Sequence, residues 1–487
     1  MLERYKLKYK NMPVQVRASF WFLICSFLQK GISTITTPIF TRLLSTEEYG
    51  QYSVFQSWLG IITIFVTMNM YSGVYTQGLI KFSDKRRIYA SAFQRLTFVM
   101  VIVWTGIYLL FQNFWNRLFQ LTTVQMLAML LMIWTTAVFN FWAAEQRVEY
   151  RYRRLVTVTL LVSFLKPLVG IVFVIHAQDK VTARILGLAL VELIGYTGLF
   201  FVQIKRGGRV LTVEFWKYAI MISVPLIPHY LSQTVLGNAD RIMITNMVGN
   251  SEAGIYSLAY SLSQIMTLFN TSLMSTISPW IYQKIKERKT EDIAGTAYVA
   301  LTLIAGVNLL LIAFAPETVA IFAPTSYYDA IWVIPPVAMS VFFMFCYDLF
   351  AKFEFYFEKT HYIMFASVCG AVLNIILNYF FIRKFGYYAA GYTTLLCYIV
   401  YALLHYAFMK KVCKEHLNGA KVYSAKVLIG MAVIFFALGF IFLFTYKIPV
   451  LRYLLVMVLL VTVIWKRKYI IRRIKSVMQA RKIRQQK

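Results

Sequence analysis

The stretch KGISTITTPIFTRLLSTEEYGQYS, residues 30–53, leaves one long apolar run and enters the next, and part of it occurs twice in the chain. Four of its residues recur at a constant spacing of 204 positions, namely Glu48, Gly50, Tyr52 and Ser53, matched by Glu252, Gly254, Tyr256 and Ser257. Gly187 and Gly391 have the same spacing. Six membrane crossings return a chain to the same side, so the repeat predicts two parallel six-helix halves.

Apolar runs near the length that crosses the hydrocarbon core occupy most of the chain. The first group is 16–38, 49–70, 89–111, 123–144, 155–175 and 182–204. The second group is 215–236, 254–280, 293–315, 330–350, 361–382 and 386–409, with an added pair at 423–446 and 450–465. We therefore predict an all-α polytopic membrane protein with about 14 transmembrane helices.

The repeat and the runs also predict where the chain divides. We expect an N-terminal six-helix lobe over residues 1–206, a C-terminal six-helix lobe over 207–412, an extra transmembrane helix pair over 413–466 and a basic cytoplasmic tail over 467–487. The lobes are expected to be pseudo-symmetric and to face a central cavity. No loop is long enough for a domain outside the membrane.

The charges predict the orientation. The chain has 50 Lys and Arg against 20 Asp and Glu, and the basic residues gather in alternate gaps between apolar runs. Basic loops stay in the cytoplasm, so both termini are expected there, and the first run is expected to be an uncleaved anchor. Because the positive charge is dispersed over many segments, it indicates contact with membrane lipids and no nucleic-acid partner. The tail reads equally as an amphipathic helix on the inner leaflet or as a disordered retention segment.

Motifs for chemistry are absent from the sequence. We find no phosphate-binding GxxxxGK[ST] loop, no GxSxG and no clustered metal ligands, and the five cysteines are scattered. We therefore expect no enzyme, no catalytic residue, no metal and no cofactor. Energy for transport would come from an ion gradient, the membrane potential or the substrate's own gradient.

Charged side chains inside apolar runs are the first site candidates, because a charge facing lipid costs several kcal/mol. The clearest are Lys30, Lys166 and Glu192. Lys30 shares one helical face with the hydroxyl residues Ser26, Ser33, Thr34 and Thr37, which predicts a cavity wall with a cation at mid-depth. The alternative is that Lys30 pairs with Glu192 or bonds backbone carbonyls near Pro38. Lys166 precedes Pro167, at a possible kink in the fifth run.

The seventh run combines helix-breaking prolines with groups that can carry a proton. Pro225 and Pro228 interrupt the helix, and His229 and Asp240 follow on one face. We predict roles in ion coupling or gating for these four residues, for Glu192 and for Asp348. The alternative is a static kink with Asp240 paired to a neighbouring helix. Hydroxyl and amide stripes, including Asn374 and Asn378, predict either contacts between helices or hydrogen bonds to sugar.

Residues 30–53 resemble the opening of the Wzx-type polysaccharide flippases, in which KG, PIFTRLLS and EEYGxYS join the first two spans. Residues 225–229, PLIPH, leading to 238–241, NADR, resemble the seventh span of the same family. The resemblance implies a MATE-like fold in the multidrug/oligosaccharidyl-lipid/polysaccharide exporter superfamily. It also implies the flipping of undecaprenyl-pyrophosphate-linked oligosaccharide from the inner to the outer leaflet of the bacterial cytoplasmic membrane, for capsule, O-antigen or exopolysaccharide.

The resemblance suggests roles and partners as well. Lys30 and Lys166 would bind the pyrophosphate, with Arg241 assisting by analogy, and the partners would be a polysaccharide polymerase and a chain-length regulator. Three alternatives stay open: a cation-coupled multidrug antiporter, which Glu192 supports, a lipid II flippase of the same fold, and a membrane-embedded glycan polymerase. The antiporter would want carboxylates where Lys30 stands, and the polymerase would want a large outer loop.

Overall fold

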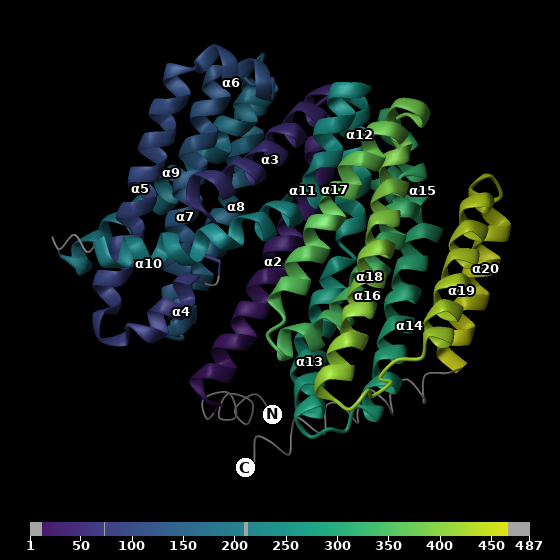
Figure 1. Cartoon of the computed structure of the whole chain (residues 1–487). Coiled ribbons are helices and arrows are strands. Elements are labelled where there is room, and N and C mark those ends of the chain that lie inside the picture. Colours follow the sequence, from purple (N-terminus) through teal and green to yellow (C-terminus); the bar gives the residue numbers. More distant parts are fainter. Residues whose placement is uncertain (1–11, 73, 209–212, 466–487) are drawn as a thin grey trace, which may run out of the picture. The chain divides into compact units, whose positions relative to one another are not determined.

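The computed structural model describes residues 12–72, 74–208 and 213–465, which are helices joined by short connections without any β-strand in that part of the chain (Figure 1). The basic segment at Arg4 to Lys10 and the predicted tail at 467–487 lie outside the described residues. The chain divides into two compact units, Met1–Thr234 and Val235–Lys487. The lobe boundary at 206 and the separate helix pair at 413–466 remain predictions.

Helices α7 and α9 are the central helices of the first unit. Its helices are α2 (Val14–Leu43), α3 (Thr46–Thr67), α4 (Val74–Lys81), α5 (Arg86–Leu110), α6 (Gln112–Phe119), α7 (Thr123–Val148), α8 (Tyr152–His176), α9 (Lys180–Gly207) and α10 (Val213–Ser223), with 3-10 turns at Ser83–Lys85 and Val224–Leu226. Helix α9 packs against α5, α7 and α8, and α2 packs against α8. Helix α11 (Ile227–Met247) crosses from the first unit into the second.

The second unit is built on α16 and α18. Its other helices are α12 (Asn250–Gln264), α13 (Thr267–Lys286), α14 (Glu291–Ala313), α15 (Ala315–Phe322), α16 (Ile334–Tyr356), α17 (Thr360–Phe385), α18 (Tyr388–His416), α19 (Ala425–Phe444) and α20 (Pro449–Trp465), with 3-10 turns at Thr325–Trp332 and Thr445–Lys447. Phe342, Phe345 and Phe353 of α16 are among the largest fully buried side chains. Helices α19 and α20, yellow in Figure 1, lie beside α14.

Eleven helices in the described part of the chain are long and apolar enough to cross a membrane. The remaining predicted spans correspond to α3, to α20 and to α12 with α13. The span predicted as continuous over 254–280 is interrupted after Gln264, where Ile265 and Met266 bond carbonyls three residues earlier at 3.2 and 3.0 Å. These bonds tighten the helix for about one turn, which an apolar run does not indicate. The chain is an all-α polytopic membrane protein.

The repeated glutamate has a structural role in the first half. Glu48 is the third residue of α3, and Ser45 and Glu48 form a reciprocal capping box with distances of 3.1 and 2.8 Å. This box satisfies two backbone N–H groups at the start of the helix. Glu252 is likewise the third residue of α12, where Gly249 stands in the position of Ser45. The repeat therefore marks the same place in two equivalent helices.

The repeated glycines lie where helices approach closely. A Cβ atom at Gly187 of α9 would be 3.1 Å from the Cα of Gly170 in α8, and one at Gly391 of α18 would be 2.9 Å from Cγ of Pro336 in α16. Small residues allow such approach between membrane helices. The contacts hold α8 against α9 in the first unit and α16 against α18 in the second.

We predict that Gly391→Ala destabilises the protein by about 1–3 kcal/mol, because the added methyl group overlaps a rigid proline ring. The measurement is thermal unfolding of purified protein in detergent. Gly306→Ala in α14 is the matched control, since no atom lies within 4 Å of its added Cβ and alanine favours a helix. Equal unfolding temperatures for the two variants would contradict the close contact.

Candidate functional site

The polar face of α2 carries the first candidate cation. Ser26, Thr34 and Thr37 each donate the hydroxyl to a carbonyl one turn earlier in the same helix, at 3.0, 2.9 and 3.0 Å. Lys30 is half-buried between them, and its ammonium has neither a hydrogen bond nor an ion pair within the described residues. The hydroxyls are thus partly satisfied by the helix, whereas the charge of Lys30 is not compensated. The alternative pairing of Lys30 with Glu192 does not occur.

Glu192 pairs with the other predicted cation. Glu192 of α9 is only 2% exposed, and its Oε1 lies 2.6 Å from the Nζ of Lys166 in α8. Its Oε2 accepts hydrogen bonds from the hydroxyls of Thr135 and Thr136 in α7, at 2.8 and 3.1 Å. Such a set compensates a buried carboxylate well. Three helices of the first unit are joined here, and the charges of Lys166 and Glu192 neutralise each other.

The proline break predicted in the seventh run is present. Helix α10 ends at Ser223, Pro225 lies in the 3-10 turn Val224–Leu226, and Pro228 lies in the first turn of α11. His229 follows, with its ring beside that of Tyr230. The change from α-helix to 3-10 turn therefore lies next to the titratable side chain of His229. The gating role of these residues remains a prediction.

Asp240 of α11 is held in a buried polar network of the second unit. It is 1% exposed, its Oδ2 accepts hydrogen bonds from the hydroxyls of Tyr256 and Thr394, the latter at 2.8 Å, and its Oδ1 accepts one from Asn378 Nδ2 at 2.6 Å. All three donors are neutral, and Asp240 forms no ion pair among the described residues. A buried carboxylate in this condition is expensive unless a proton or a cation accompanies it.

The network continues through amides that the sequence showed as a polar stripe. Asn378 also donates to Asn374 Oδ1 at 3.2 Å and accepts from the hydroxyl of Thr393, and Asn374 donates to the hydroxyl of Thr394 at 3.5 Å. These residues come from α17 and α18. Neutral hydrogen-bond donors from three helices, α12, α17 and α18, therefore surround the Asp240 carboxylate.

Two predicted residues have local partners. The Arg241 guanidinium donates to the Gly237 carbonyl at 3.0 Å and stacks on the Tyr260 ring, 4.4 Å from its centroid. Asp348 of α16 forms an ion pair with Lys352 one turn later, with its side chain 32% exposed. Because such a pair stabilises a helix by itself, Asp348 is the weakest of the coupling candidates.

Two buried acids were not predicted from the sequence. Glu145 of α7 accepts a hydrogen bond from Gln203 at 2.7 Å, and Gln203 in turn accepts one from Gln94 at 2.6 Å. Glu354 of α16 bonds His405 of α18. Both glutamates are near the ends of apolar runs, where a carboxylate usually reaches water, so their positions gave no signal.

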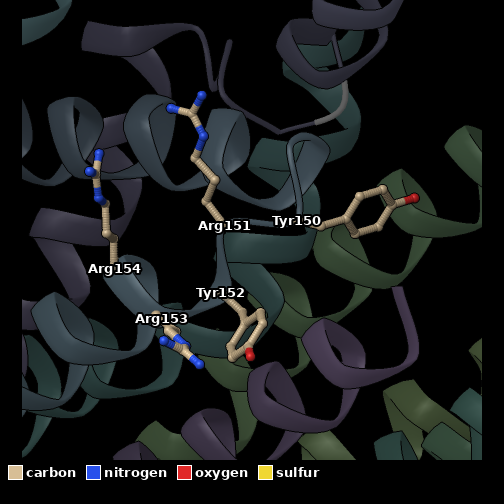
Figure 2. Close-up of a pocket in the computed structure, with 5 residues that line it drawn as sticks. All are labelled: Tyr150, Arg151, Tyr152, Arg153 and Arg154. Atoms are coloured by element: carbon tan, nitrogen blue, oxygen red, sulfur yellow. The ribbon is translucent and has the colours of Figure 1, made fainter. Parts of the chain in front are cut away.

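A basic turn joins α7 to α8 in the first unit. Tyr150, Arg151, Tyr152, Arg153 and Arg154 line a hollow of about 540 Å³. Figure 2 shows the Arg151 and Arg154 side chains extending from one side of the turn, with Arg153 and Tyr152 on the other. Of these arginines, Arg151 is partly neutralised by Glu149, 3.0 Å away. The turn coincides with one of the basic gaps that predicted the cytoplasmic side.

Comparison with known proteins identifies the family. The family model described as polysaccharide biosynthesis protein matches residues 16–285, and the MatE family model matches residues 225–380. The Lsg locus putative protein 1 of Haemophilus influenzae is 22% identical over 388 residues, covering 73% of this chain and 88% of that protein.

Solved structures share the fold. The lipid II flippase MurJ in an inward closed conformation aligns with a TM-score of 0.68 at 13% identity, covering 92% of this chain and 99% of MurJ. An inward-facing multidrug resistance MATE transporter aligns with a TM-score of 0.65 at 13% identity, covering 80% of this chain and 96% of that one. The fold of this chain is therefore similar to that of MurJ and of the MATE transporter. The chain belongs to the polysaccharide biosynthesis protein family, whose model matches more than half of it.

Proposed function

We propose that this protein flips an undecaprenyl-pyrophosphate-linked oligosaccharide from the inner to the outer leaflet of the bacterial cytoplasmic membrane by alternating access. Family membership supports a role in polysaccharide biosynthesis, and the fold supports a transporter. The observation that supports an anionic substrate is the environment of Lys30. Lys30 is a half-buried cation in the middle of α2 without a carboxylate partner among the described residues.

The charge of a pyrophosphate explains why an uncompensated cation matters. An anion that leaves water needs fixed positive charge and hydrogen-bond donors to replace its hydration. Lys30 can supply both, and the hydroxyls of α2 lie on the same face. Lys166 supplies less, because Glu192 already neutralises it at 2.6 Å. We therefore place Lys30 as the main pyrophosphate contact, with Lys166 as a residue that shapes this part of the first unit and Arg241 as an assisting donor.

The same geometry disfavours a multidrug antiporter. A site for cationic drugs needs a carboxylate that is free to meet the drug. In the first unit Glu192 is buried and occupied by Lys166, Thr135 and Thr136. A lipid II flippase would use a similar cation, and identification of the glycan that accumulates in a deletion strain separates these two substrates.

Ion coupling is assigned to Asp240 in this proposal. Its carboxylate is buried, and the hydroxyl and amide groups that donate hydrogen bonds to it are neutral. Binding of a proton or a hard monovalent cation would neutralise the site, so an ion gradient could drive a change between conformations of the second unit. The orientation that accompanies the proposal has both termini in the cytoplasm, and a polysaccharide polymerase and a chain-length regulator would act on the product outside.

We predict that Asp240→Asn removes the stimulation of transport by an imposed ion gradient, because the neutral amide no longer needs a cation. The measurement is transport in proteoliposomes with a proton or a sodium gradient applied separately, which also identifies the ion. Asp348→Asn is the control and should respond like the wild type, since Asp348 has a cationic partner in Lys352 one turn away. A full gradient response in Asp240→Asn would remove Asp240 from coupling.

The proposal is tested by deleting the gene and analysing lipid-linked oligosaccharides by mass spectrometry, with an impermeant probe of the outer leaflet. We expect fully assembled intermediates to accumulate in a form protected from the probe. Accessible but unpolymerised intermediates would indicate a polymerase, and no accumulation would favour a drug antiporter.

A further inference from the structure

A second buried titratable pair lies between α16 and α18, the central helices of the second unit. Glu354 and His405 are both 0% exposed, and the Nδ1 of His405 is 2.8 Å from the Oε1 of Glu354. The other polar atoms of the pair, Glu354 Oε2 and His405 Nε2, are also buried and have no hydrogen-bond partner within the described residues. Each side chain thus keeps an atom that can accept or release a proton.

Aromatic rings enclose the pair. The His405 ring stacks on Tyr347 of α16, with centroids 5.6 Å apart, and meets the Tyr401 ring of α18 edge to face at 4.6 Å. The Tyr401 hydroxyl is hydrogen-bonded to Ser367 of α17 at 3.0 Å. This surrounding offers little hydration to a charge, so the net charge of the pair decides its stability.

No basic side chain offsets the glutamate directly. Apart from His405, the ion pairs of the described residues leave Glu354 without a cationic partner, and Lys352 on the same helix is bonded to Asp348. His361 at the start of α17 acts on Glu354 through its charge only. From α13, Tyr282 contacts Tyr356 near the end of α16 rather than the pair.

The number of protons on the pair follows from these contacts. With an ionised Glu354 and a neutral His405, the pair carries one negative charge in a closed, weakly hydrated place. One added proton makes the pair neutral, as an imidazolium beside a carboxylate, so that His405 carries the proton. We propose that Glu354 and His405 together form a proton-binding site that takes up and releases one proton.

One exposed titratable residue interacts electrostatically with the pair. His361 is exposed at the first turn of α17, on the side that the charge pattern places in the cytoplasm, and it is an electrostatic neighbour of Glu354. The site is separate from the Asp240 network, and it does not depend on the identity of the glycan or on the proposed function.

The test uses the protein in lipid nanodiscs with ¹⁵N-labelled histidine. The chain has five histidines, so few signals arise, and the signal that disappears in His405→Gln belongs to His405. We expect the His405 nitrogens to change reversibly, by one proton, between pH 5 and pH 9. The exposed residues His176 and His416 serve as internal references for the His405 signal.

Glu354→Gln is the decisive variant because its amide oxygen can still accept the hydrogen bond from Nδ1 while the carboxylate is lost. A neutral His405 then leaves the site uncharged, and we expect no transition of its signal between pH 5 and pH 9. Ser367→Ala is the control, since it removes a buried hydrogen bond at the same place without removing a titratable group, and it should keep the transition.

A His405 signal that does not change with pH in the wild type, or an unchanged transition in Glu354→Gln, would overturn the proposal. Failure of the flippase assignment would leave these spectra unaffected.

Discussion

Replacement of Lys30 by alanine is expected to reduce export of the surface glycan by about 10- to 100-fold while the protein remains folded in the membrane. The range corresponds to the loss of one charge-assisted hydrogen bond of about 1.5–3 kcal/mol. The Lys30 ammonium has no hydrogen bond or ion pair among the described residues, so its removal leaves no buried charge uncompensated and should not destabilise α2. The measurement is surface glycan per unit of membrane-inserted protein in the deletion strain carrying each variant.

Lys30→Arg and Lys30→Gln are the informative companions. Arginine keeps the charge and should retain much of the export, whereas glutamine keeps a hydrogen-bond donor without the charge and should behave like alanine if charge is decisive. Lys180→Ala is a matched control in the same unit, because its ammonium bonds the Leu43 carbonyl at the end of α2, away from the polar face. Normal export by Lys30→Ala at normal protein levels would remove Lys30 from the binding site.

Breaking the ion pair of Lys166 and Glu192 is expected to affect the stability of the protein more than its transport activity. Replacing Lys166 should destabilise the protein more than replacing Glu192. Lys166→Ala leaves a carboxylate that is 2% exposed with only two hydroxyl donors, and should cost about 3 kcal/mol. Glu192→Gln leaves a lysine whose side chain is 29% exposed and can turn toward water, so it should cost clearly less. The measurement is thermal unfolding in detergent together with the amount of protein in the membrane.

The double variant Lys166→Ala with Glu192→Gln separates pairing from packing. Because no buried charge remains, it should be more stable than Lys166→Ala alone. If Glu192→Gln destabilises as much as Lys166→Ala, or if the double variant is the least stable, the pair is not the compensated site that the distances indicate.

The helices could be predicted from the sequence because membrane spans are determined by local properties. The length of the apolar run at 123–144 predicted a transmembrane helix, and the structure has α7 there, over Thr123–Val148. Pro225 and Pro228 predicted the break in the helix that lies between α10 and α11. The repeat of Glu48 as Glu252 identified two equivalent helix starts, and a capping box explains the first of them. The tightened turn after Gln264 was missed because it depends on backbone bonds that hydropathy does not record.

The side-chain partners could not be predicted because they depend on which helices are neighbours. In the sequence, Lys30 and Lys166 are both cations within apolar runs. Only the packing of α8 on α9 shows that Glu192 forms an ion pair with Lys166. Glu354 and His405 are 51 positions apart, and Glu354 stands among lysines at the end of a run, where a solvated carboxylate is the ordinary expectation. Asp240 was identified as a candidate, but its donors on α12, α17 and α18 required the fold.

The most direct test of the proposed activity is translocation by purified protein in proteoliposomes. A fluorescent undecaprenyl-pyrophosphate glycan is placed in both leaflets, and an impermeant quencher is added outside. Active protein should allow nearly all of the fluorescence to be quenched, because the glycan moves continually between leaflets, whereas protein-free vesicles should keep the inner leaflet protected. Lys30→Ala should lose this protection about 10- to 100-fold more slowly than the wild type. Protection of the inner half by the wild-type protein, with correct folding shown by its unfolding temperature, would contradict the account.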